Sequence, residues 1–134
     1  MTTHQTGPFL VTGASGQLGR LTIDHLLNVG AGPISATTRS PEKLAEYAAR
    51  GVDVRGADFD DPSSLARAFA GARRMLMIST DDLLPGKRFE AHRAAIAAAV
   101  LAGVQHLVYT SLTNPGPDSP IPFAADHDQT EAEL

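Results

Sequence analysis

The sequence predicts an α/β fold: a doubly wound parallel sheet of about five strands, in the order 3-2-1-4-5, with helices on both faces. Three observations favour this fold class. Short apolar runs alternate with helical segments along all 134 residues. Most of these runs are apolar throughout, as is typical of strands buried on both faces of a parallel sheet. A glycine-rich turn joins the first run to the first helical segment.

The elements follow one another in a regular order. We expect strands at residues 9–12, 34–38, 52–55, 75–79 and 106–111. We expect helices at residues 17–29, 41–49, 62–69 and 86–102, with another beginning near residue 126. Ser40 and Asp61 each precede a proline and are predicted N-caps. Glycine stands just past four of the helices, where a left-handed backbone is needed: Gly30, Gly51, Gly71 and Gly103.

The helix predicted at residues 86–102 has apolar and small residues at spacings of three and four. This spacing predicts that one face of the helix packs on the sheet. The residues expected on that face are Phe89, His92, Ile96, Ala99, Val100 and Gly103.

Composition limits the classes of function. A length of 134 residues fits one domain. The net charge is −4 and no long basic run occurs, which disfavours nucleic acid binding. The absence of cysteine excludes a disulfide framework and a thiolate metal site, and we expect no metal. Because the N-terminus lacks a signal-peptide pattern and no apolar stretch approaches the roughly 20 residues of a membrane span, we expect a cytoplasmic protein.

The glycine-rich turn has the sequence VTGASGQLG, with glycine at positions 13, 16 and 19. It follows a strand and opens a helix within a βαβ unit of roughly 30 residues, which is the context of a dinucleotide fingerprint. Gly13 permits the turn, Gly16 lets a pyrophosphate approach the main chain, and Gly19 lets the helix pack on the strand. The N–H groups at the helix N-terminus would bind the anion. A glycine-rich turn without a ligand is the alternative; a P-loop is excluded because no lysine follows.

The end of the second strand favours NADP over NAD. An NAD site usually has an acidic residue about 20 residues beyond the fingerprint, and here Arg39 occupies that position. An arginine suits the 2′-phosphate of NADP, with Lys43 as a second cation. The alternative is that Arg39 is a solvated loop residue.

Two further segments are candidate cofactor contacts. Asp58 follows the third strand and could accept a hydrogen bond from the adenine amino group, while the ring of Phe59 could border the base. The alternative is a solvated acidic turn. Ser79 and Thr80 end the fourth strand, where a doubly wound sheet presents its ligand crevice, although they could also be turn formers.

Four segments together resemble a known family: VTGASGQLGR, TTRSPEK, GADFDDPSSL and AAAVLAGVQHLVYTSL. They resemble the atypical short-chain dehydrogenase/reductases, in particular the NmrA-like group and its NAD(P)H:quinone oxidoreductases. The resemblance covers almost the whole chain and implies a Rossmann domain over residues 1–134. It also implies two-electron reduction of a quinone or a similar small carbonyl acceptor by NADPH. The cofactor contacts that it implies are Gly13, Ser15, Gly16, Gln17, Leu18, Arg39, Lys43, Asp58 and Ser79.

The sequence departs from this family's wider superfamily at the catalytic residues. Ser111 matches the serine at the end of the fifth strand, but no Tyr-x-x-x-Lys pair follows. A carbonyl-to-alcohol reaction with a tyrosine as general acid is therefore disfavoured. Quinone reduction tolerates this loss better, because the hydroquinone anion is delocalised and solvent can protonate it. His127 is a candidate proton donor, against the alternative of a structural or solvated histidine, and His92 is a weaker candidate.

Related proteins of this family continue with a sixth strand and a region that covers the substrate. We therefore expect the chain to be truncated at its C-terminus, without that cap. The fifth strand would then be an unpaired edge that invites association, for example as a homodimer.

Two other functions compete with the reductase. One is a non-enzymatic NAD(P) sensor of NmrA type, in which the bound cofactor changes the affinity for a partner protein. The other is a receiver-type α/β domain, which is disfavoured because acidic residues should follow the first strand and Thr12 and Gly13 stand there instead.

Overall fold

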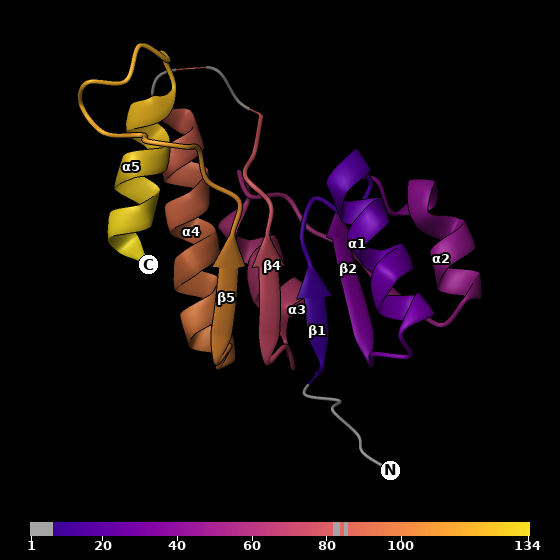
Figure 1. The fold of residues 1–134 in the computed structure, drawn as a ribbon. Helices are drawn as coiled ribbons and strands as arrows, with labels where there is room; N and C mark the ends of the chain where they lie inside the picture. Colours follow the sequence, from indigo (N-terminus) through magenta and orange to yellow (C-terminus); the bar gives the residue numbers. More distant parts are fainter. Residues whose placement is uncertain (1–6, 82–83, 85) are drawn as a thin grey trace.

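The computed structural model describes residues 7–81, 84 and 86–134. Its centre is a five-stranded sheet in the order β3-β2-β1-β4-β5, with every neighbouring pair parallel (Figure 1). The strands are β1 (Phe9–Val11), β2 (Ile34–Thr38), β3 (Asp53–Gly56), β4 (Arg74–Met77) and β5 (His106–Tyr109). The predicted fold class and strand order are thus confirmed.

Helices cover both faces of the sheet. They are α1 (Gln17–Asn28), α2 (Ala45–Ala49), α3 (Pro62–Phe69), α4 (Lys87–Ala102) and α5 (Ala124–Glu133), with a 3-10 turn η1 (Pro41–Leu44) before α2. Adjacent residues of β1 contact opposite layers, since successive strand side chains alternate. Leu10 belongs to the core beneath α3 and α4, and Val11 belongs to the core beneath α1 and α2. The helix α5 lies beside α4 at the β5 end of the molecule (Figure 1).

The observed bounds differ from the predicted ones by one or two residues at several element ends, and in two places the contacts give the reason. The helix predicted at residues 41–49 begins as the 3-10 turn η1, and the side chain of Ser40 does not cap it. Instead, the Ser40 amide donates to Thr38 Oγ1 at 3.1 Å. The strands β4 and β5 end two residues earlier than predicted. At that point the Ser79 amide donates to the side-chain hydroxyl of Thr110 at 2.8 Å, rather than to a neighbouring backbone carbonyl.

The predicted helix ends are otherwise confirmed. Asp61 caps α3, its carboxylate accepting from the Ser63 amide at 3.2 Å. The four glycines expected past helix ends all have positive φ: Gly30, Gly51, Gly71 and Gly103.

The packing face of α4 was predicted only in part. Its buried residues are Arg88, Ala91, His92, Ala95, Ile96 and Ala99. His92, Ile96 and Ala99 agree with the prediction, but Val100 is 71% exposed and was wrongly placed in the core. The buried stripe follows positions 88, 92, 95 and 99, at spacings of three and four, so the next residue in the helix turns away from the sheet.

Candidate dinucleotide site

The carboxyl ends of β1, β2, β3 and β4 surround a cavity of about 520 Å³. This is the point at which the strand order reverses, where doubly wound sheets bind ligands. Nine of the predicted cofactor residues line the cavity: Gly13, Ser15, Gly16, Arg39, Lys43, Asp58, Phe59, Ser79 and Thr80. The other three predicted contacts, Gln17, Leu18 and Gly19, lie in the first turn of α1 and are not part of the lining.

Two glycines of the turn are required by its geometry. Gly13 has a φ of +57°, a left-handed conformation that favours glycine. At Gly19 an added Cβ would lie 2.6 Å from both Gly13 O and Ala14 Cα, so only glycine lets α1 pack this closely on the turn. Gly16 is different, since its φ is −80° and an added Cβ would meet only Gly13 O, at 3.4 Å.

The N-terminus of α1 faces the same turn. Gly16 is its N-cap residue and supplies no side-chain hydrogen bond. The first N–H groups of a helix have no partner within the helix. In the described structure no side chain caps them, so the amides of the first turn of α1 are available to an anion, which the helix dipole also attracts.

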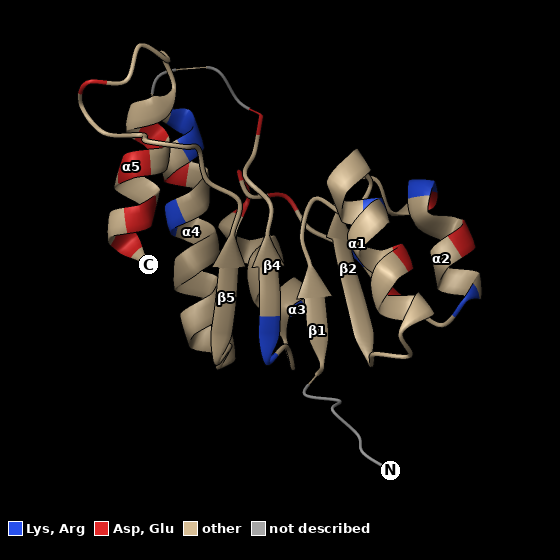
Figure 2. Ribbon diagram, in the orientation of Figure 1, with Lys and Arg blue, Asp and Glu red and all other residues tan. Residues whose placement is uncertain are grey.

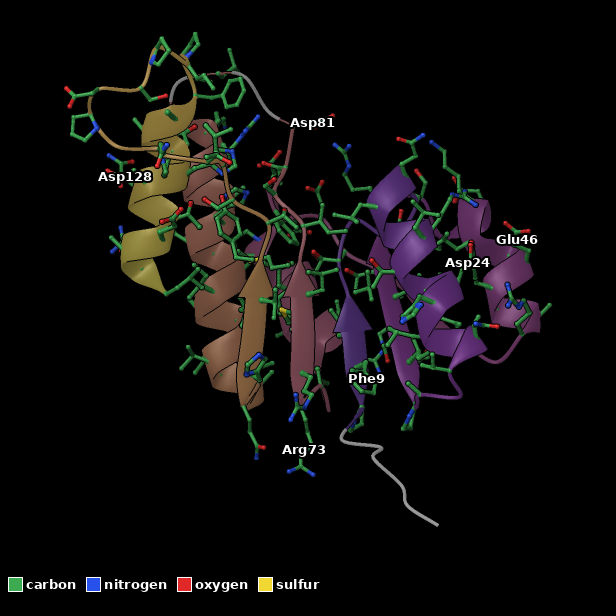
Figure 3. The ribbon with its side chains drawn as sticks, in the orientation of Figure 1. Phe9, Asp24, Glu46, Arg73, Asp81 and Asp128 are labelled. Atoms are coloured by element: carbon green, nitrogen blue, oxygen red, sulfur yellow. The ribbon has the colours of Figure 1, made fainter. Side chains whose placement is uncertain are left out.

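Arg20 fixes the turn to the neighbouring cationic segment, and sequence reasoning missed it. Its Nε donates to the Ser15 carbonyl and its Nη2 to the Lys43 carbonyl, both at 3.0 Å. Its Nη1 lies 3.1 Å from Glu46 Oε1, and Figure 3 shows Glu46 on α2. The signal was present, because Arg20 directly follows the last glycine of the fingerprint. Its partners could not be read from the sequence.

A second link holds the end of β2 against the turn. Thr38 Oγ1 donates to Ser15 Oγ at 3.0 Å and accepts from the Ser40 amide. Arg39 lies between these anchored residues, with an exposed side chain. In the described part of the chain, neither the Arg39 nor the Lys43 side chain forms an ion pair or hydrogen bond, so both positive charges are available to a bound phosphate.

Acidic residues line the side of the cavity nearer β3 and β4. Asp58 lines the cavity, and its Oδ1 accepts from the Asp60 amide at 2.9 Å, which makes a local turn. Asp81 follows β4 and also lines the cavity; Figure 3 shows it above the carboxyl end of the sheet. Phe59 packs edge-on against Phe69 of α3, with ring centroids 6.4 Å apart. The cavity therefore has cations at its β2 end and carboxylates elsewhere. Figure 2 shows the basic residues of the segment that leads into α2 in blue and an acidic residue in the segment after β4 in red.

The wall after β4 carries a polar atom that lacks a partner. Thr80 Oγ1 is buried and makes no hydrogen bond within residues 7–81, 84 and 86–134. A buried hydroxyl left unsatisfied costs about 1–3 kcal/mol. Because Thr80 lines the cavity, a bound ligand with polar groups could supply the missing hydrogen bond. This atom, the two cations that lack partners among the described residues, and the uncapped helix N-terminus together fit a phosphorylated dinucleotide.

The two catalytic candidates lie outside the cavity lining. Ser111 is exposed and its hydroxyl donates to the Glu131 carboxylate on α5. His127 is buried, with Nδ1 2.6 Å from Tyr109 Oη and Nε2 2.9 Å from Arg88 Nη1. Burial, and then the Arg88 guanidinium, lowers the pKa of His127. Since arginine can only donate, His127 Nε2 accepts, and Nδ1 of the neutral ring carries the proton toward Tyr109.

His92 and Tyr109 join His127 in one buried cluster. The rings of His92 and Tyr109 lie edge-on with centroids 5.2 Å apart. Burial is the main cause that lowers the pKa of His92 to about 4, and burial also raises the pKa of Tyr109 to about 12. Both groups are therefore neutral near pH 7. Sequence reasoning did not find this cluster, because its members come from α4, β5 and α5 and share no spacing pattern.

No helix in the described structure is long and apolar enough to cross a membrane. Within the same residues, no group of three or more histidine or carboxylate side chains is arranged to hold a metal ion.

Comparison with known proteins agrees with this geometry. A family model described as NAD(P)H-binding matches residues 13–132. The chain is 41% identical over 125 residues to quinone oxidoreductase 2 of Escherichia coli, which covers 92% of this chain and 43% of that protein. It is 34% identical over 133 residues to an NmrA-like family domain-containing oxidoreductase of Aspergillus flavus, covering 94% of this chain and 43% of that protein.

A solved structure is similar to the same degree. The crystal structure of Citrobacter sp. triphenylmethane reductase complexed with NADP(H) has a TM-score of 0.86 at 40% sequence identity, and covers 93% of this chain and 44% of that one. The chain thus spans less than half the length of each of these proteins. The predicted resemblance to NmrA-like proteins and quinone oxidoreductases is confirmed.

Proposed function

Since the chain belongs to this NAD(P)H-binding family, we propose that it binds NADPH in the cavity and serves the two-electron reduction of a quinone or a similar small carbonyl acceptor. The observation that carries the proposal is that Arg39 and Lys43 lie beside the glycine-rich turn with no ion-pair or hydrogen-bond partner for their side chains in the part of the chain that the structure describes. The relatives named quinone oxidoreductase and triphenylmethane reductase, the latter complexed with NADP(H), support both the cofactor and the reaction class. We further propose that residues 1–134 form one dinucleotide-binding domain.

Each part of the cofactor has a matching group in the cavity. The pyrophosphate would accept hydrogen bonds from the amides of the first turn of α1, near Gly16. The 2′-phosphate would lie between Arg39 and Lys43, and Phe59 would border the adenine. The nicotinamide half would extend over the end of β4 toward Thr80. Bound NADPH supplies a hydride to the acceptor.

Reduction of a quinone also needs a proton. We propose that solvent supplies it, relayed through the Ser111 and His127 region, because a neutral His127 can pass a proton on only as it receives another. Both residues follow or face β5, on the nicotinamide side of the sheet, and His127 Nδ1 lies 2.6 Å from the Tyr109 hydroxyl. Because delocalisation stabilises the hydroquinone anion, a strong general acid beside the substrate is unnecessary.

A non-enzymatic NAD(P) sensor is the second candidate function. The observation that favours it is that neither Ser111 nor His127 lines the cavity. In a sensor the cavity would bind the dinucleotide without hydride transfer, and bound cofactor would change the affinity for a partner protein.

Two further properties stay proposals. We propose a homodimer, supported by β5 as an edge of the described sheet with Val108 49% exposed. Gel filtration with light scattering would test it, and a monomer at all concentrations would contradict it. We also propose a cytoplasmic location, supported by the absence of cysteine.

The function is tested by mixing the chain with NADPH and a panel of quinones under anaerobic conditions. Fluorescence reports cofactor binding, and the loss of NADPH absorbance reports turnover. We expect saturable binding and acceptor-dependent oxidation of NADPH. Saturable binding without oxidation would favour the sensor, and the absence of binding would contradict the site itself.

A further inference from the structure

A buried chain of hydrogen bonds runs from α5 to the wall of the cavity. The Thr80 amide donates to His92 Nε2 at 3.0 Å. The opposite nitrogen of that ring, Nδ1, lies 3.0 Å from Thr130 Oγ1, which donates to the Asp126 carbonyl at 2.7 Å. His92 and Thr130 are both fully buried. These hydrogen bonds link three parts of the fold: the segment after β4, the helix α4 and the helix α5.

Chemistry fixes the direction of each hydrogen bond. A backbone N–H can only donate, so His92 Nε2 must be the acceptor and Nδ1 carries the proton of the neutral ring. The Thr130 hydroxyl uses its own proton on Asp126 and accepts from His92. Burial lowers the pKa of His92 to about 4, so the ring keeps its accepting nitrogen near pH 7. The His92 Nδ1 proton therefore has Thr130 Oγ1 as its nearer acceptor, at 3.0 Å, and Tyr109 Oη as a longer contact, at 3.3 Å.

Thr80, at the end of these hydrogen bonds, is part of the cavity wall. Thr80 lines the cavity just beyond β4, in a segment that belongs to no helix or strand. Its amide is held by His92, and its buried Oγ1 has no hydrogen-bond partner within the described residues. A dinucleotide with its adenosine ribose at the end of β2 would place its other half at the end of β4.

We propose that His92 is a positioning residue for the nicotinamide half of the bound cofactor, acting through the Thr80 amide, with Thr130 holding His92 in the required tautomer. The inference rests on the proposed binding of NADPH. His92 does not line the cavity and does not contact the cofactor site directly. Its role is to fix the backbone at Thr80, and with it the direction of the free Thr80 hydroxyl.

Two substitutions of His92, similar in size, test the hydrogen bonds of its two ring nitrogens separately. In His92→Gln the side-chain amide reaches the position of Nε2 and can still accept from the Thr80 amide. In His92→Asn the amide reaches only the position of Nδ1, so the contact with Thr130 is kept and the one with Thr80 is lost. Dissociation constants are measured by fluorescence titration, with NADPH and with adenosine 2′,5′-bisphosphate, which carries only the adenine end.

We expect His92→Asn to weaken NADPH binding about tenfold, the effect of losing one hydrogen bond, and His92→Gln to stay within about twofold of the unsubstituted chain. Both variants should bind adenosine 2′,5′-bisphosphate as the unsubstituted chain does, since Arg39 and Lys43 are unchanged. Equal NADPH affinities for the two variants would overturn the inference. So would a parallel loss of both ligands, which would indicate only a general structural defect.

A second pair of variants tests the hydrogen bond between Thr130 and His92 and leaves the imidazole of His92 unchanged. Thr130→Val keeps the side-chain shape and removes the nearer acceptor of the His92 proton, leaving only the longer contact with Tyr109 Oη at 3.3 Å, whereas Thr130→Ser keeps the nearer acceptor. We expect only the valine variant to weaken NADPH binding, and unchanged affinity in it would overturn the role of Thr130. If the unsubstituted chain binds adenosine 2′,5′-bisphosphate but not NADPH, the inference fails while the adenine site stands. If it binds neither ligand, the proposed function fails.

Discussion

Arg39 stands at the end of β2 with its guanidinium group exposed beside the cavity. Anchored residues hold the backbone on either side of it, since Thr38 Oγ1 contacts both Ser15 and Ser40. The backbone at Arg39 is therefore held in position, and in the described structure the N–H groups of its guanidinium have no hydrogen-bond acceptor. A planar guanidinium can bind a phosphate with two parallel hydrogen bonds.

The Arg39 side chain should discriminate between the two dinucleotides. We expect Arg39→Ala to weaken NADPH binding by about 1.5–3 kcal/mol, the contribution of charged hydrogen bonds, and to leave NADH binding nearly unchanged. Titration of each cofactor measures the effect. Arg67→Ala, which removes an exposed arginine from α3, is the matched control and should bind both cofactors normally. Equal losses for NADPH and NADH would contradict the 2′-phosphate assignment.

The glycines at positions 16 and 19 should respond differently to a methyl group. Gly19→Ala would place Cβ 2.6 Å from backbone atoms, so we expect a loss of about 1–3 kcal/mol in the free energy of unfolding, as in other overpacked sites. Gly16→Ala meets only one contact, at 3.4 Å, and should fold normally but bind NADPH less well, because the methyl group faces the pyrophosphate.

Urea unfolding and NADPH titration separate these two effects. Gly116→Ala is the control for both, since an added Cβ there meets nothing within 4 Å. A stable Gly19→Ala variant would show that the turn and α1 can move apart. Unchanged NADPH affinity in Gly16→Ala would place the pyrophosphate elsewhere.

At the scale of elements, one arginine joins α1, the glycine-rich turn and η1. Arg20 donates to the carbonyls of Ser15 and Lys43, so it holds the glycine-rich turn beside the cationic segment. Local sequence signals predict each of these elements, whereas the side chain of Arg20 makes the contacts between them. The contact is worth more than an exposed ion pair because its acceptors are fixed backbone groups.

We expect Arg20→Met to lower the free energy of unfolding by about 1–2 kcal/mol and to weaken NADPH binding. Arg50→Met is a matched control: Arg50 also lies over the Tyr47 ring, at 5.7 Å compared with 6.0 Å for Arg20, and forms only an exposed ion pair with Asp24. It should lose at most about 1 kcal/mol and bind NADPH normally. Equal effects of the two substitutions in urea unfolding and titration would show that Arg20 acts only through the Tyr47 ring.

At the scale of the whole molecule, two buried neutral histidines make stability depend on pH. The pKa of His92 falls from 6.5 to about 4 on folding, and the pKa of His127 is also lowered. Between those values the unfolded chain binds more protons than the folded one. Stability therefore rises with pH over that window, and the contribution is complete above about pH 6.5.

On acidification from about pH 6.5 to pH 4, we expect the free energy of unfolding to fall by as much as about 1.4 kcal/mol per pH unit through His92, and His127 to add to the fall in the same direction. Urea unfolding at a series of pH values measures this slope. His92→Gln should reduce the slope in this window, and His106→Gln, which removes an exposed ring, is the matched control. A slope that is the same in all three proteins would show that His92 does not cause the acid sensitivity.

The sequence by itself determined the fold class, the strand order, most helix bounds and the glycine-rich turn. These follow from local signals: runs of apolar residues, N-caps, glycines past helix ends, and Arg39 at a fixed distance from the fingerprint. Only the tertiary structure decided that Val100 is exposed, that Arg20 joins three segments, and that Thr80, His92 and Thr130 form one chain. Those contacts depend on helix rotation and on side chains from elements far apart in sequence, whose distances and hydrogen-bond directions no local pattern contains.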